Sequence, residues 1–250
     1  MKTIVLAAGH GYRPDGTFDV GATNPNVPSL NEHSLNVKVR NAAIQYLSQY
    51  ECKIISDENI YGSAHEPNWS GLIKYYSKST NKPDLVLEIH HDSWNAANKG
   101  FGILPKTLFR RSITNLADDI TKEYKLWNLP TKPSYSDVRG LGLLKVLQYP
   151  TLIWECAATL QVTDNTLNVR GISIAAGIAV WAGLNKNLAP SKNLQINEEY
   201  LRRVRIYFGL HGIGGYNQEF IDKLIEWKMH NGFFASPVIA PYHLTAMGIV

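Results

Sequence analysis

The chain has 250 residues, of which 44% are hydrophobic, so it can bury one medium-sized core and still hold a small additional module. Its formal net charge of +4 comes without a basic run or a basic and aromatic stripe, which argues against nucleic-acid binding but permits mild attraction to an anionic cell wall. No apolar run approaches the roughly 20 residues that span a bilayer, so we expect no membrane insertion. The opening, MKTIVLAAGHG, reaches Gly9 and His10 too early for a secretory signal, which predicts synthesis in the cytoplasm.

Strands and helices are predicted to alternate along the first three quarters of the chain. Short apolar runs predict about six strands, at residues 3–10, 52–57, 85–90, 101–105, 141–147 and 151–156. Apolar residues at helical spacing predict helices at residues 32–48, 69–79, 112–127 and 165–183. This alternation predicts an α/β fold with a mostly parallel, twisted sheet flanked by helices. In such sheets the chemistry gathers beyond the carboxyl ends of the strands.

The composition changes near the end of this α/β region. The stretch NKNLAPSKNLQIN is polar, contains a proline and has no apolar period, so we expect a linker at residues 186–197. It would separate a domain at residues 1–185 from a small all-α module at residues 198–250. In that module, the segments beginning EEYL and NQEF each place apolar side chains on one helical face.

Three candidate metal ligands come from the ends of separate elements. His10 follows the first predicted strand, Glu32 begins the first long helix, and His90 ends the strand LVLEIH. Two imidazoles, one carboxylate and a water form a catalytic zinc (Zn2+) set. Glu155 interrupts the apolar strand TLIWEC, where an unpartnered carboxylate would be costly, so it is the candidate general base.

Each of these residues also has an ordinary structural explanation. Ser29 and Glu32 have the spacing of a capping box, so Glu32 could simply cap its helix. The histidines could be loop or strand-end residues, and Glu155 could pair with Arg139 inside the protein. Neighbouring strand residues point to opposite faces, so only one of His90 and His91 can face the site, and the strand pattern leaves that choice open. Cys52 and Cys156 are too few for a Cys-rich zinc site and read as buried free thiols.

The stretch IVLAAGHGYRPDG, followed by GATNPN and SLNEHSLNVKVRNAAIQYL, resembles the opening of zinc-dependent N-acetylmuramoyl-L-alanine amidases of the LytC/AmiC type. The resemblance covers roughly residues 1–184. It implies that His10, Glu32 and His90, rather than His91, bind zinc. It also implies that Glu155 in YPTLIWE is catalytic and that Arg139 in DVRGLGLLKVL lies near the substrate groove. Residues 91–93 depart from the family pattern, and we expect them to shape the rim or to orient the ligand histidine.

The last part of the chain resembles a degenerate three-helix peptidoglycan-binding module. The cues are GIGG at residues 212–215, Trp227, NGF at residues 231–233, and the final segment SPVIAPYHLTAM. The alternative is a helical cap that packs on the first domain.

These resemblances predict a peptidoglycan hydrolase that cleaves the amide between N-acetylmuramic acid and L-alanine. The architecture favours a phage or prophage lysin that acts on the cell wall after release from the cell. The rival predictions are a zinc peptidase or other amidohydrolase, and a cell-wall-binding protein without activity. The sequence makes no prediction of the oligomeric state.

Overall fold

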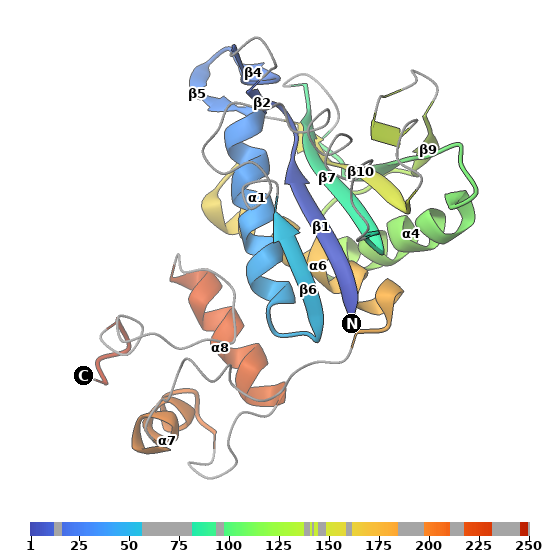
Figure 1. The fold of residues 1–250 in the computed structure, drawn as a ribbon. Coiled ribbons are helices and arrows are strands. Elements are labelled where there is room, and N and C mark those ends of the chain that lie inside the picture. The colour runs from blue at the N-terminus through green and yellow to red at the C-terminus, as the bar shows by residue number, and fades with distance from the viewer. Residues whose placement is uncertain are drawn as a thin grey trace.

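The structure, a computed structural model, describes residues 1–12, 17–56, 82–93, 98–137, 141, 143–144, 149–158, 162–184, 198–210, 218–231 and 246–249. Within this part of the chain, a six-stranded sheet has the order β6-β1-β7-β10-β8-β9 (Figure 1). All its pairings are parallel except the antiparallel pairing of β10 with β8. The strands are β1 (Lys2–Ala8), β6 (Cys52–Ser56), β7 (Leu85–Asp92), β8 (Phe101–Leu104), β9 (Tyr135–Ser136) and β10 (Thr151–Ala158). The predicted fold class, an α/β protein with a mostly parallel sheet, is therefore confirmed.

One strand prediction is wrong. Leu143 and Leu144, within the predicted strand at residues 141–147, are helical, and the sixth strand is the short β9 instead. A short apolar run does not distinguish a buried strand from a buried helical turn. Both leucines are buried in one apolar cluster with Val86 and Ile153 of the sheet. The apolar run therefore belongs to a buried helical segment and not to a buried strand.

Three helices form one hydrophobic core with the sheet. They are α1 (Glu32–Leu47), α4 (Arg110–Leu126) and α6 (Asp164–Ala182). Their core faces meet the alternate strand residues Leu6, Leu87, Ile89 and Trp154, which point to the same side of the sheet. Helix α6 contacts both α1 and α4, so it is apolar around most of its circumference.

Small antiparallel pairs fill the connection between β1 and α1. The strand β2 (Gly11–Tyr12) pairs with β3 (Phe18–Asp19), and β4 (Thr23–Asn24) pairs with β5 (Val27–Asn31). In Figure 1 the labelled strands β2, β4 and β5 lie beyond the end of the sheet toward which β1 points. The chain between β1 and α1 is therefore available to surround a site at the carboxyl ends of the strands.

Two helices follow the α/β region, α7 (Glu198–Tyr207) and α8 (Gln218–His230). Their apolar residues, among them Val204, Phe220 and Leu224, share one buried cluster with Val169 and Ile172 of α6. The C-terminal helices therefore pack against the α/β region. The predicted linker at residues 186–197, the predicted helix at residues 69–79 and most of the final segment SPVIAPYHLTAM lie outside the described residues. No helix in the described part of the chain has both the length and the apolar character that crossing a membrane requires.

Candidate metal centre

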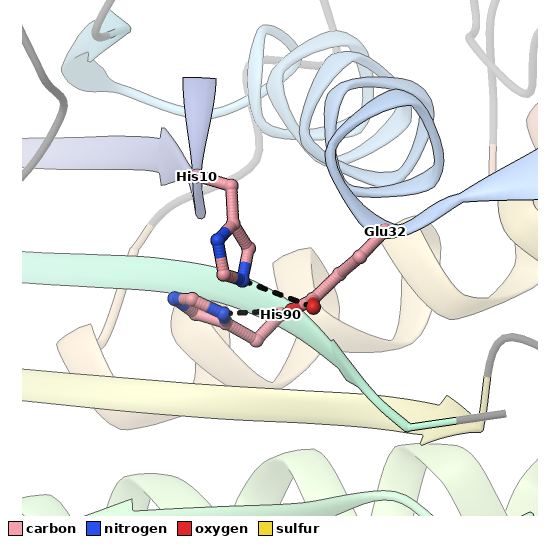
Figure 2. Close-up of side chains that lie close together, drawn as sticks. All are labelled: His10, Glu32 and His90. Atoms are coloured by element: carbon pink, nitrogen blue, oxygen red, sulfur yellow. Dashed lines mark hydrogen bonds and ion pairs between the residues drawn. The ribbon is translucent and has the colours of Figure 1, made fainter. Parts of the chain in front are cut away.

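His10, Glu32 and His90 converge at the carboxyl end of the sheet (Figure 2). His10 follows β1, Glu32 is the first residue of α1, and His90 lies near the end of β7. The Nε2 atom of His10 lies 3.0 Å from Oε2 of Glu32, and Nδ1 of His90 lies 2.9 Å from Oε1 of the same carboxylate. One potential ligand atom from each residue lies within 4.8 Å of the other two. The three residues that the sequence singled out as ligands are thus brought together.

The backbone around His10 is held in an unusual conformation. His10 has a φ of 66°, in the left-handed region that non-glycine residues rarely occupy, and this ends the extended β1 strand before it. The preceding Gly9 donates its N–H to the carbonyl of Ile89, at 2.8 Å. Its own carbonyl accepts from Nδ1 of His33 at 2.9 Å and from Nδ2 of Asn36 at 3.2 Å, both on α1. The turn that carries His10 is therefore bonded both to β7 and to α1.

Glu32 does not cap its helix. The N-cap of α1 is Asn31, whose side chain accepts from the N–H of Ser34, so the capping-box interpretation of Glu32 is wrong. The buried carboxylate of Glu32 accepts instead from the backbone N–H groups of Ala22, at 2.9 Å, and His91, at 3.2 Å. Burial by itself would raise the pKa of Glu32, but hydrogen bonds and charge from the two site histidines hold that pKa well below its usual range.

Two glycines pack directly against these side chains. A Cβ atom on Gly9 would lie 2.3 Å from ring atoms of His90. A Cβ atom on Gly21, whose φ is +70°, would lie 2.6 Å both from Oε2 of Glu32 and from the ring of His10. Neither glycine was singled out in the sequence. Gly9 directly precedes His10, and this position is the signal that could have found it. Gly21 is distant in the sequence from both His10 and Glu32 and carries no such signal.

A second carboxylate, also missed in the sequence, contacts His10. Oδ2 of Asp19 lies 3.1 Å from Nδ1 of His10, on the side of the ring that faces away from Glu32. The other oxygen of Asp19 accepts from the N–H of Gly21 at 2.9 Å. Burial would lower the pKa of His10, but its contacts with Glu32 and Asp19 raise that pKa above its ordinary value.

The structure places His91 apart from the three converging side chains. Its backbone N–H contacts Glu32, but its ring is buried and Nδ1 lies 2.7 Å from Oδ1 of Asn36. Burial, with a smaller effect from the charge of Arg170, lowers the pKa of His91 well below its ordinary value. A neutral His91 ring therefore donates its Nδ1–H to Asn36, which itself bonds to Gly9. Of the two expected roles of His91, the structure favours support of the site and not formation of its rim.

Glu155 lies on the strand next to His90. The two residues are direct register partners in the parallel pairing of β10 with β7, so they share one face of the sheet. Glu155 is half-buried. Burial would lower the pKa of His90, but Glu88 and Glu32, with a smaller effect from the charge of Glu155, raise that pKa well above its ordinary value. Arg139 lies outside the described residues. Cys52 and Cys156 are both free cysteines, but only Cys156 is buried, and burial raises its pKa to about 12.

The donor set fits a zinc ion. Zinc bonds of about 2.0–2.2 Å to nitrogen and oxygen place neighbouring ligand atoms of a tetrahedral site roughly 3.4 Å apart. The two histidine–glutamate contacts, at 3.0 and 2.9 Å, already have this scale. Two imidazoles and one carboxylate also leave further coordination positions for water and substrate, as catalytic zinc sites require.

Solved amidase structures have a similar fold. The CwlD amidase of Clostridioides difficile, solved in complex with the GerS lipoprotein, is 18% identical, with a TM-score of 0.61 over 73% of this chain and 99% of that chain. The catalytic domain of CwlV, an N-acetylmuramoyl-L-alanine amidase from Bacillus (Paenibacillus) polymyxa var. colistinus, is 15% identical, with a TM-score of 0.58 over 74% and 100% of the two chains. The catalytic domain of the CD27L endolysin, which targets Clostridia difficile, is 12% identical, with a TM-score of 0.51 over 72% and 98%.

At these identities the likeness shows the fold alone. A comparison of the sequence with curated proteins gave no match. The model of the family Amidase_3, described as N-acetylmuramoyl-L-alanine amidase, matches residues 4–185, which is most of the chain. This chain therefore belongs to the Amidase_3 family of N-acetylmuramoyl-L-alanine amidases.

Proposed function

We propose that this amidase is a zinc-dependent peptidoglycan hydrolase, in which His10, Glu32 and His90 hold the metal and Glu155 is the general base. The observation that carries the proposal is the convergence of the three ligands within 4.8 Å, with Glu155 in register beside His90. The bond cut is the amide between the lactyl group of N-acetylmuramic acid and L-alanine of the stem peptide. The family match supports this choice of substrate.

The protein residues divide the chemistry between them. A bound zinc ion would polarise the scissile carbonyl and lower the pKa of a water molecule. Glu155 takes a proton from the water while the water oxygen forms a bond to the carbonyl carbon. The carbon–nitrogen bond to the stem peptide then breaks. Glu155 returns the proton to the departing amine nitrogen, so one carboxylate acts as base and then as acid. Arg139 is proposed to orient the substrate.

The experiment measures zinc content and wall-lysing activity on the same preparations. Wild type is expected to hold about one zinc and to lyse purified walls. Glu155→Gln keeps the metal and loses lysis, whereas His10→Ala loses both. Glu219→Gln, an exposed substitution on α8, is the matched control and retains both. Lysis by Glu155→Gln at the wild-type rate would refute the base assignment.

Product analysis separates amidase from peptidase activity. The amidase releases a lactyl carboxylate on the muramic acid and a free amine on L-alanine, whereas a zinc peptidase would create a new peptide end. Zinc-dependent lysis itself excludes a wall-binding protein without activity. A protein that binds walls and holds zinc but releases no product would contradict the proposed function.

The C-terminal helices are proposed to bind the cell wall, as part of a phage or prophage lysin. A pocket of about 230 Å³ on α8 and the end of α7 is lined by Phe208, Lys223, Glu226, Trp227 and His230. Aromatic rings beside charged groups suit the apolar face and polar edge of a sugar ring. A wall-binding pocket linked to the amidase would raise the local concentration of the amidase on its polymeric substrate.

This part of the proposal is tested by binding, without turnover. Wall sugars in the pocket would contact Trp227. In the Glu155→Gln background, we therefore expect Trp227→Ala to raise the dissociation constant for purified walls at least 10-fold. Trp127→Ala, on the half-exposed tryptophan that ends α4, is the matched control. Equal retention of both variants would refute wall binding through this pocket.

A further inference from the structure

We propose that Glu88 is a positioning residue of the metal centre, whose buried carboxylate holds the Nε2–H of His90 and so directs Nδ1 of that ring toward Glu32. This inference rests on the proposed zinc function. It assigns a role to a residue that lies outside the ligand set, in a strand whose other buried residues, apart from His91, are apolar.

Glu88 lies behind His90 on β7. It precedes His90 by two residues, so both side chains project from the same face of the strand. Its register partners are Ala7 on β1 and Ile153 on β10, both part of a buried apolar cluster. Only 4% of Glu88 is exposed, and a carboxylate buried in such surroundings is costly unless a donor faces it.

The ring of His90 supplies that donor. Oε2 of Glu88 lies 3.4 Å from Nε2 of His90, while Nδ1 of the same ring lies 2.9 Å from Oε1 of Glu32. The two nitrogens of His90 therefore face two different carboxylates. A neutral imidazole carries one N–H, and a carboxylate beside one nitrogen keeps the proton there and leaves the lone pair of the other nitrogen for a metal.

His10 has the same arrangement with its nitrogens exchanged. Its Nε2 faces Glu32 at 3.0 Å, and its Nδ1 faces Asp19 at 3.1 Å. Each candidate ligand histidine thus has one nitrogen toward Glu32 and the other toward a separate carboxylate. Metal-binding histidines are commonly oriented in this way, and removing the outer partner typically costs about 10- to 100-fold in metal affinity.

The position of Glu88 argues against a role in proton transfer. It pairs with Ile153, two residues before Glu155 on β10, so it lies deeper along the strands than the register pair of His90 and Glu155. It is also buried, whereas Glu155 is half-buried. A water or substrate that approaches the carboxyl edge of the sheet meets Glu155 and His90 first. Glu88 therefore acts through His90.

The test measures zinc affinity by competition with a chelator, together with urea unfolding of the metal-free protein. Glu88→Met has similar volume but no acceptor, and we expect it to weaken zinc binding about 10- to 100-fold. Glu88→Gln keeps an oxygen that can accept the Nε2–H, and we expect it to recover most of the affinity. For each variant, we expect the loss in the free energy of unfolding of the metal-free protein to be smaller than the loss in the free energy of zinc binding.

The outcomes separate this inference from the function on which it rests. If wild type binds zinc and Glu88→Met binds it equally well, Glu88 has no positioning role, although the zinc function stands. A Glu88→Met variant that loses only metal-free stability, at unchanged affinity, likewise overturns the inference, because Glu88 is then purely structural. If wild type binds no zinc while remaining folded, the proposed function fails and this inference fails with it.

Discussion

Replacing Gly9 by alanine would put a methyl carbon against the ring of His90. The new Cβ would lie 2.3 Å from Cε1 and Nε2 of that ring and 2.6 Å from Nδ1. Gly9 is not among the described glycines with positive φ, so alanine is compatible with its backbone. The perturbation is therefore a steric one, aimed at a single candidate ligand.

The size of the effect follows from the contact distance. Ordinary contact begins near 3.4 Å, so the ring of His90 must retreat from 2.3 Å by about 1.1 Å. A misplacement of roughly 1 Å in a catalytic site can cost about 100-fold in rate, and a zinc–nitrogen bond tolerates less. We expect Gly9→Ala to lower zinc affinity by at least about 100-fold, with an overpacking cost of roughly 1–3 kcal/mol in stability.

The assay compares zinc affinity and urea unfolding with those of a matched variant. Gly100→Ala would place its Cβ 2.7 Å from the ring of Tyr124, an aromatic contact that involves none of the candidate ligands. It should lose similar stability and keep its zinc. A folded Gly9→Ala protein that binds zinc like wild type would refute the assignment of His90 as a ligand held against Gly9.

Three further predictions concern other parts of the structure. Asn36→Leu leaves the Nδ1–H of His91 without its acceptor and should cost about 2 kcal/mol in urea unfolding, whereas an unchanged midpoint would contradict the bond. Gly171→Ala, whose Cβ would lie 2.6 Å from Ala42, should lower the free energy of unfolding by about 3 kcal/mol. Gly183→Ala, whose Cβ would meet open space, should lower it by about 1 kcal/mol. Equal losses would exclude tight packing of α1 against α6. Burial lowers the pKa of Lys228 to about 7, so between pH 7 and 10 the unfolded chain keeps a proton on Lys228 that the folded chain has lost. The stability of wild type relative to Lys228→Met should therefore rise by about 3 kcal/mol over that range. A stability difference that does not change with pH would contradict the lowered pKa.

The elements of the fold were largely predictable because their signals are local. The buried strands read as short apolar runs, and α4 reads as a helix because its apolar residues recur every three or four positions. The run at residues 141–147 was wrongly predicted as a strand because its leucines are buried without being extended. The two-residue strand β9 had no signal, since a strand that short has no period.

The candidate ligands were predictable for a different reason. His10, Glu32 and His90 each stand at the end of a predictable element, and parallel strands bring such ends to one edge. The resemblance to a family, and not the strand pattern, chose His90 over His91. The side chains that support the ligands were missed, because the contacts of Glu88, Asp19 and Asn36 depend on how separate segments pack.

The sequence by itself determined the α/β class, the residue types of the candidate ligands and the order in which the chain supplies them, because these follow from periodicity and element ends. Only the tertiary structure decided which nitrogen of each histidine faces Glu32, that Asn31 caps α1, and that His91 turns into the core. The physical reason is that orientation is set by partners distant in the sequence. Asp19 and Glu88 face His10 and His90 only once the β1–α1 connection and the central strand are in place.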